Sequence, residues 1–360
     1  MNLATAGIVT ILRNTMKSGK SPNGVADRSS AHITRREALK KTVVFSTSFL
    51  TAGWLNSLQA KSPEIEFSKD GLHFLAIGDF GSGNANQKAV AQGMATFAKT
   101  LNAPLTAVLA LGDNFYGKHT PERFTNHFEE MYSKDGLDCP FYACLGNHDY
   151  GPKYDSNQGP AKAQIQLDYA KDNPQSRWKM PAKWYSLELP NAKKPLVKII
   201  FLDGNTIEGS LTPQEKLAQK RFLEAELKKK TGARWQWVVS HFPMFSETVK
   251  RGDNSKLIEQ MGEYLKTNPI SFFLTGHDHN LQHLEAEGFK TSFVISGAGG
   301  AGLYDVKPST RGFTEKILGF THLHVARDKT TVQFIDTESR CLHAFQRSLK
   351  GKVEVISKAG

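Results

Sequence analysis

Gly276-His277-Asp278-His279-Asn280 follows the apolar run Ile270–Leu274, which has the length and composition of a buried strand. Because side chains alternate along an extended segment, His277 and His279 lie on one face of it. Four earlier segments have the same form, an apolar run followed by potential metal ligands: Gly78-Asp79-Phe80-Gly81, Gly112-Asp113-Asn114-Phe115-Tyr116, Gly146-Asn147-His148-Asp149 and Val238-Val239-Ser240-His241. Taken singly, each has a structural explanation, since Asp and Asn are common turn residues. Together they indicate a metal site.

The five segments supply seven candidate metal ligands. These are Asp79, Asp113, Tyr116, Asn147, His241, His277 and His279. The set is large enough for two metal ions that share one carboxylate, and Asp113 is the predicted bridge. Oxygen ligands mixed with imidazoles suit iron, manganese or zinc better than copper. Two metals roughly 3.5 Å apart can neutralise a phosphate ester, activate water and assist the leaving group, so the set indicates phosphate-ester hydrolysis.

The chain around these segments alternates predicted strands with predicted helices, which favours a layered, mainly parallel sheet. The other predicted strands of this part are His73–Ile77, Leu105–Leu111, Phe141–Leu145, Trp184–Leu189, Leu196–Leu202 and Trp235–Ser240. The predicted helices are Gln87–Leu101, Pro121–Tyr132, one that Thr212 caps and that runs to Lys230, and Ser255–Lys266. Ligands of such sheets gather beyond the carboxyl ends of the strands, where the candidate ligands lie.

Two further parts of the chain have a different pattern. Residues 150–183 are polar and irregular, and they are predicted to form a long loop. Beyond residue 280, the pattern changes to strands joined by turns, which predicts a second, largely antiparallel sheet. These strands are Leu281–Ala286, Thr291–Ser296, Gly319–Ala326 and Thr330–Asp336.

The N-terminal 60 residues are predicted to be a leader. Thr34-Arg35-Arg36-Glu37-Ala38-Leu39-Lys40 precedes a moderately apolar run, residues 42–58, and this arrangement resembles a twin-arginine export signal. It predicts passage through the twin-arginine export machinery and a periplasmic or secreted location. The run contains Ser, Thr and Gly, so no stable membrane span is expected after processing.

Composition narrows the class of protein further. The chain has 360 residues, 39% of them hydrophobic, and a formal net charge of +11. More than half of that charge lies in the leader, and no stripe of Lys and Arg alternates with aromatics, so nucleic-acid binding is not predicted. A mildly basic body suits an anionic substrate such as a phosphate ester. The three cysteines, Cys139, Cys144 and Cys341, lack the CxxC spacing of zinc or redox sites.

The five segments resemble those of the metallophosphoesterase superfamily and, within it, the purple acid phosphatases, above all the small tartrate-resistant type. The resemblance covers most of residues 72–350 and extends to Asn280-Leu281-Gln282 and Ser296-Gly297-Ala298-Gly299. Tyr116 discriminates within the superfamily, because the tyrosine of purple acid phosphatases at this position binds ferric iron. The resemblance implies a calcineurin-like catalytic domain over residues 70–350, an α/β fold built as a four-layer α/β/β/α sandwich of two mixed sheets.

The resemblance also implies a role for each residue. A ferric site would use Asp79, Asp113, Tyr116 and His279, and a divalent site for iron, zinc or manganese would use Asp113, Asn147, His241 and His277. His148 matches the family's substrate-binding, proton-donating histidine. A metal-bound hydroxide would attack the phosphomonoester, which makes the protein an exported acid phosphatase.

One position departs from the family. Lys250, followed by Arg251, stands where a second histidine is usual. Both are predicted to bind substrate, while leaving-group protonation would rest on His148. Three alternatives remain: an exported phosphodiesterase or nucleotidase with manganese or zinc, a catalytically weak phosphate- or metal-binding protein, and peroxide chemistry as an iron-driven side activity. His73, His119, His127, His283, His322, His324 and His343 receive no role in the site.

Overall fold

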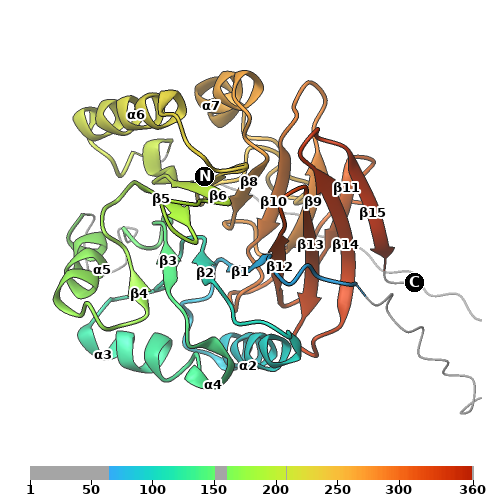
Figure 1. The fold of residues 1–360 in the computed structure, drawn as a ribbon. Helices are drawn as coiled ribbons and strands as arrows, with labels where there is room; N and C mark the ends of the chain where they lie inside the picture. The colour runs from blue at the N-terminus through green and yellow to red at the C-terminus, as the bar shows by residue number, and fades with distance from the viewer. Residues whose placement is uncertain (1–64, 151–159, 208, 359–360) are drawn as a thin grey trace, which may run out of the picture. The chain divides into compact units, whose positions relative to one another are not determined.

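Two β-sheets pack face to face, and helices cover the outer face of each (Figure 1). The computed structural model describes residues 65–150, 160–207 and 209–358, all within one compact unit, Ser62–Gly360. The predicted leader and its export signal lie outside the described residues. None of the helices in the described ranges is long and apolar enough to cross a membrane.

The first sheet has eight strands. They are β1 (Leu72–Ile77), β2 (Ala107–Ala110), β3 (Phe141–Ala143), β4 (Trp178–Lys179), β12 (Gly319–Val325), β13 (Lys329–Asp336), β14 (Cys341–Ser348) and β15 (Val353–Lys358). Their order is β15-β14-β13-β12-β1-β2-β3-β4. Strands β1 to β4 are parallel, whereas β12 to β15 continue antiparallel from β1. The sheet is therefore mixed.

The second sheet has seven strands. They are β5 (Tyr185–Leu189), β6 (Val197–Phe201), β7 (Trp235–Val239), β8 (Phe272–Thr275), β9 (Leu281–Glu285), β10 (Ser292–Ser296) and β11 (Gly312–Glu315), in the order β11-β9-β10-β8-β7-β6-β5. The central strands β6, β7, β8 and β10 are parallel, and the strands at both edges are antiparallel. This sheet is also mixed.

The helices form two groups (Figure 1). Against the first sheet lie α2 (Ala85–Thr100), α3 (Pro121–Phe124) with a π-helical turn (Thr125–Glu129), α4 (Lys134–Leu137) and α5 (Pro160–Asp172). Against the second lie α6 (Pro213–Lys228) and α7 (Ser255–Thr267), and a 3-10 turn (Gly204–Thr206) follows β6. Thr212 caps α6 as predicted: its hydroxyl accepts the Glu215 N–H (3.2 Å), and the Glu215 carboxylate accepts the Thr212 N–H (2.8 Å).

Three hydrophobic cores hold the four layers together. Val90 and Met94 of α2 pack with Leu75 and Ile77 on one side of the first sheet. The core between the sheets contains Phe74, Trp237 and Leu323, among others. Leu223 of α6 and Leu257 of α7 pack with Val238 on the outer side of the second sheet. The predicted α/β/β/α sandwich of two mixed sheets is therefore confirmed.

Two local predictions are wrong. Residues 150–183 do not form one long loop, because they contain α5 and β4. The strands after β8 do not make a separate sheet: β9, β10 and β11 extend the second sheet, and β12 to β15 extend the first. Each sheet therefore combines parallel strands from the first part of the chain with antiparallel strands from the last part.

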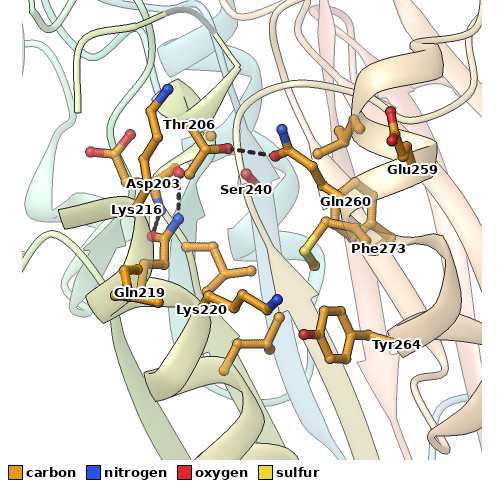
Figure 2. A pocket seen from close by; sticks show the side chains of 16 residues that line it. Asp203, Thr206, Lys216, Gln219, Lys220, Ser240, Glu259, Gln260, Tyr264 and Phe273 are labelled. Atoms are coloured by element: carbon orange, nitrogen blue, oxygen red, sulfur yellow. Dashed lines mark hydrogen bonds between the residues drawn. The ribbon is translucent and has the colours of Figure 1, made fainter. Parts of the chain in front are cut away.

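A cavity of about 600 Å³ lies between α6 and α7 (Figure 2). The predicted metal ligands are not among the residues that line it, so it is a second feature of the fold.

Candidate metal centre

The seven predicted ligands all lie in loops that follow parallel strands. Asp79, Asp113 and Asn147 come after β1, β2 and β3, whereas His241 follows β7 and His277 follows β8. The two sheets meet at Gly78 and Gly276, where a Cβ atom on Gly78 would lie 2.9 Å from the Gly276 Cα. Because glycine has no side chain here, the ligand loops of the two sheets can come together.

Three of these residues have a strained backbone. Asp79, Asp113 and His277 have positive φ angles of 57°, 52° and 66°. Residues other than glycine seldom adopt this left-handed conformation, and it costs on the order of 1 kcal/mol or more for each. Hydrogen bonds hold it in place, since the Asp79 N–H donates to the Gly112 carbonyl (3.0 Å) and the His277 N–H donates to Asp79 Oδ2 (2.7 Å). Such strain concentrates at functional sites.

One cluster of potential ligand atoms combines residues from the loops of both sheets. Asn147 Oδ1 lies 3.0 Å from His277 Nδ1 and 3.2 Å from His241 Nε2, and the two imidazole nitrogens are 3.3 Å apart. Asp113 Oδ1 is 3.4 Å from His241 Nε2. Because the Nδ1–H of His241 donates to the Leu111 carbonyl (2.8 Å), Nε2 turns its lone pair toward the cluster. Asn147 Oδ1 and Asp113 Oδ1 are both acceptors, and ring nitrogens of two histidines face them, an arrangement that suits a cation.

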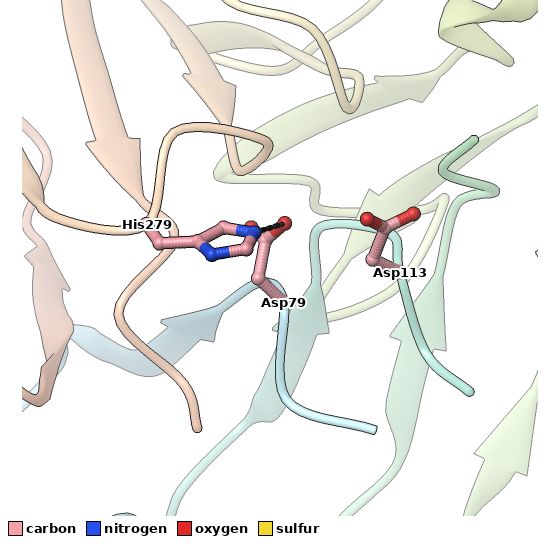
Figure 3. Close-up of side chains that lie close together, drawn as sticks. All are labelled: Asp79, Asp113 and His279. Carbon is pink, nitrogen blue, oxygen red and sulfur yellow. Dashed lines mark ion pairs between the residues drawn. The ribbon is translucent and has the colours of Figure 1, made fainter. Parts of the chain in front are cut away.

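A second cluster lies on the other side of Asp113. Asp79 Oδ1, the Tyr116 hydroxyl and His279 Nε2 are each 3.3 Å from one another. The Nδ1–H of His279 donates to the Gly302 carbonyl (2.7 Å), so Nε2 again faces the cluster. Ligand atoms of Asp79, Asp113 and His279 all lie within 4.8 Å of one another (Figure 3). The two clusters thus border the same carboxylate, as a shared bridging ligand requires.

The charges of the buried groups favour a cation. Burial opposes ionisation of Asp113, yet His241, His148 and His277 hold its pKa below the usual range. Burial likewise opposes the charge on His241, but Asp113 raises the pKa of that histidine to about 9. Burial and the carboxylates of Asp113 and Asp79 raise the pKa of Tyr116 well above 10, so only a strong positive charge could ionise it. The residues fit a pair of metal ions.

The remaining predicted site residues differ in their placement. The His148 N–H donates to Asp113 Oδ1 (2.8 Å), and the His148 ring lies 4.7 Å from the Tyr116 ring. Arg251 lines a cavity with His277, and its Nε lies 3.2 Å from Asp278 Oδ1. Lys250 is exposed and does not line that cavity, but it lines a neighbouring one with Arg251 and Tyr304. The structure therefore brings His148 and Arg251 to the clusters and leaves Lys250 one cavity away.

Arg251 has a second contact that fixes its position. Its guanidinium lies 5.1 Å from the ring centre of Tyr304, and that ring stacks on His279 at 4.1 Å. A cation held between a buried carboxylate and an aromatic face loses little freedom when it binds an anion.

Three residues that support the ligand loops, Asp149, Lys162 and Gln166, received no role in the sequence analysis. The buried Asp149 carboxylate accepts the backbone N–H groups of Asn114 (2.9 Å), Phe115 (3.1 Å) and Gly146 (2.8 Å). It thereby joins the loop after β2 to the loop after β3.

Two polar side chains of α5 support the same loops. Gln166 donates to Asp149 Oδ1 (2.8 Å) and accepts from the Asn114 side chain (3.1 Å), and Lys162 donates to the His148 carbonyl. Both are fully buried. Nothing in the sequence marked them, because Lys and Gln on a helix usually face solvent.

Replacing Gln166 with leucine is expected to weaken metal binding about 10- to 100-fold, the usual cost of losing an outer partner of a metal site. The change leaves Asp149 with one donor fewer, which is also expected to lower the free energy of unfolding by roughly 1–3 kcal/mol. Metal titration and denaturant unfolding measure the two effects. Gln164→Leu, an exposed change on the same helix, is the control, and equal behaviour of both variants would contradict the supporting role.

Comparison with known proteins gives consistent findings. The family model for calcineurin-like phosphoesterases matches residues 72–281. Tartrate-resistant acid phosphatase type 5 of Sus scrofa is 30% identical over 75% of this chain and 85% of its own. Purple acid phosphatase 7 of Arabidopsis thaliana is 28% identical over 84% of this chain and 94% of its own.

Two solved structures share the fold. GAP50, the anchor in the inner membrane complex of Plasmodium, has a TM-score of 0.64 at 22% identity and covers 80% of this chain and 90% of its own. The purple acid phosphatase PPD1 of yellow lupin (Lupinus luteus) has a TM-score of 0.54 at 15% identity and covers 80% of this chain and 55% of its own.

Proposed function

The chain belongs to the calcineurin-like phosphoesterases and, within them, to the purple and tartrate-resistant acid phosphatases, and we propose that this acid phosphatase-like hydrolase acts on phosphomonoesters at a binuclear metal centre after export. The position of Asp113 is the observation that carries the proposal. Its carboxylate borders both clusters of acceptor atoms, and it is buried in a site with excess acceptors.

The donor types favour different ions at the two clusters. Asp79, Tyr116 and His279 with Asp113 would hold ferric iron, because carboxylates and a phenolate offset a trivalent charge. Asn147, His241 and His277 with Asp113 would hold a divalent ion, iron, zinc or manganese, since amide and imidazole ligands are neutral. When bound, such a pair supplies charge neutralisation and an activated water.

The chain's own residues provide binding and proton transfer. The guanidinium of Arg251 would bind a phosphoryl oxygen, and its contacts with Asp278 and Tyr304 would hold it in place. As water adds to phosphorus, the bond to the ester oxygen breaks, and the imidazolium of His148 would donate its proton to that oxygen. Lys250 is exposed and would contribute only through its charge.

Purified with iron, the protein is expected to show a broad visible absorption band that Tyr116→Phe abolishes. The band arises from charge transfer between a phenolate and ferric iron, so it requires the Tyr116 oxygen. Tyr304→Phe is the matched control, because Tyr304 stacks on His279 from outside the cluster and its loss should leave the band intact.

A colourless, metal-loaded and active protein would overturn the ferric site. It would favour the alternative, a phosphodiesterase or nucleotidase with manganese or zinc. Metal loading without turnover of any aryl phosphate would instead favour a weak phosphate- or metal-binding protein.

Export through the twin-arginine machinery rests on Arg35 and Arg36 with the apolar run after them. The double change Arg35→Lys and Arg36→Lys keeps the charge but is expected to retain the protein in the cytoplasm of a bacterial host. Cell fractionation with an activity assay measures the distribution. Unchanged export would argue against this route.

A further inference from the structure

The cavity between α6 and α7 has the size and lining of a small-molecule site. Its volume of about 600 Å³ falls within the range of sites that bind organic ligands. The floor of the cavity is apolar. It is formed by Leu202 and Phe273 from the second sheet and its loops, by Leu223 of α6, and by Leu257 and Met261 of α7. An apolar surface of this kind favours an apolar ligand body.

Two lysines give the cavity a positive side. Lys216 and Lys220 stand one turn apart on α6, and in the described ranges neither lysine side chain makes an ion pair or hydrogen bond with another residue. Lys220 extends toward Tyr264 of α7, which faces it from the opposite wall (Figure 2). Glu259 supplies a negative charge from α7, and Asp203 at the inner end is already bonded to the hydroxyl of Tyr150 (2.5 Å). The Tyr264 hydroxyl donates to Glu224 Oε1 (2.7 Å), so this carboxylate also has a partner other than the lysines, and the lysine side is open to an anion.

We propose that this cavity binds an amphipathic anion, an apolar body that carries one carboxylate or sulfonate group. The body would lie on the leucine, methionine and phenylalanine floor, and the anionic group would pair with Lys220 and Lys216. Lys216 is half-buried and Lys220 is exposed, so the two lysines would contribute selectivity for anions and a modest share of the affinity.

The inner wall of the cavity is bonded to the ligand loops. Asn205, next to Gly204 of the wall, donates from its side chain to the Gly146 carbonyl (3.2 Å). Ser240 also lines the cavity and directly precedes His241. A Cβ atom on Gly204 would lie 3.0 Å from Ser240 Oγ, so the two wall segments are tightly packed. A ligand that displaces this wall is expected to shift the loops that carry Asn147 and His241, and hence to change kcat; this second part rests on the proposed function.

Binding can be measured with 8-anilinonaphthalene-1-sulfonate, which has the required shape and charge and fluoresces in apolar surroundings. Saturable binding of one molecule is expected, with displacement by decanoate but not by inorganic phosphate. Lys220→Glu should weaken binding about tenfold through charge reversal. Arg221→Glu, the same change at the next exposed position of α6 outside the cavity, should leave it unchanged.

The outcomes separate the site from its effect. Three outcomes would overturn the site: probe binding that does not saturate, displacement of the probe by phosphate, or equal affinity of the two charge-reversal variants. Displacement by decanoate supports the site, and failure of decanoate to displace the bound probe would overturn it. Hydrolysis of an aryl phosphate by Lys220→Glu, without added ligand, should match that of the unaltered protein. If decanoate saturates the cavity and kcat does not change, coupling to the loops is overturned; no hydrolysis by any form would instead refute the proposed phosphatase.

Discussion

Asp113→Asn is expected to lower kcat for an aryl phosphate about a thousandfold, the upper end of what losing one preorganised electrostatic contact costs. The asparagine oxygen can still accept the His148 N–H, so the loop should keep its position. What disappears is the negative charge between the two clusters. Without it, two cations would repel one another across the site.

The measurement combines steady-state kinetics with metal analysis of the same sample. The Asp113→Asn protein should retain less than one full pair of metals and a normal circular dichroism spectrum. Asp172→Asn, an exposed change at the end of α5, serves as the control. If Asp113→Asn keeps both metals and more than a tenth of the activity, Asp113 is not the shared ligand.

The ligand positions were predictable because each one ends a buried strand. An apolar run fixes a strand, parallel strands end at one edge, and a polar residue just beyond that edge faces its neighbours. Asp79 after β1 and His277 after β8 illustrate this across two sheets, since 198 positions separate them and a hydrogen bond joins them. Their roles as metal ligands stay predictions until metal is bound and measured.

The elements that could not be predicted from the sequence are those that bury polar side chains. Helix α5 turns Lys162 and Gln166 inward, so its buried face lacks the apolar spacing that identifies a helix. Strand β14 likewise buries His343 and Arg347. Each of these residues has a polar partner in the folded protein, and the partner lies 14 to 60 positions away in the sequence, so the local pattern does not reveal it.

Sheet membership was unpredictable for a related reason. Strand β12 pairs with β1, about 250 positions earlier in the chain, and thereby carries β13 to β15 into the first sheet. Local pattern gives a strand's existence and its buried face, but not the neighbour it selects.

Acidification from pH 7 to pH 4 is expected to remove on the order of 5 kcal/mol of stability through one histidine cluster on β1 and β12. His73 Nδ1 lies 3.0 Å from His322 Nε2, and the His324 ring lies 4.7 Å from that of His73. Burial, with His324 nearby, lowers the pKa of His73 to about 4. Burial lowers the pKa of His322 to about 3. The hydrogen bond that its Nδ1–H donates to Gln333 Oε1 of β13 (2.8 Å) acts in the opposite direction, and repulsion from His73 and His324 adds to the lowering.

The direction of the effect follows from the two states. In the unfolded chain these histidines take up protons near pH 6.5, whereas in the folded protein they stay neutral until about pH 4 or 3. The contribution of the two histidines to the free energy of unfolding is therefore nearly constant above pH 6.5. It becomes increasingly unfavourable as the pH falls from 6.5 towards their folded-state pKa values of about 4 and 3. The other facing groups do not reverse it, since Phe67 and Phe97 are neutral and Lys329 disfavours a charge on His324.

His322→Gln tests this assignment, because glutamine can keep hydrogen bonds to Gln333 and His73 but cannot titrate. The free energy of unfolding, measured between pH 6 and pH 4 with excess metal in both proteins, should fall less steeply in the variant, by about 1.4 kcal/mol per pH unit for one proton. Parallel curves would contradict the assignment. Loss of metal from the histidine ligands affects both proteins alike, so the difference in slope isolates His322. A reduced slope would mean that acidic conditions weaken the sheet whose strand β1 ends just before Asp79.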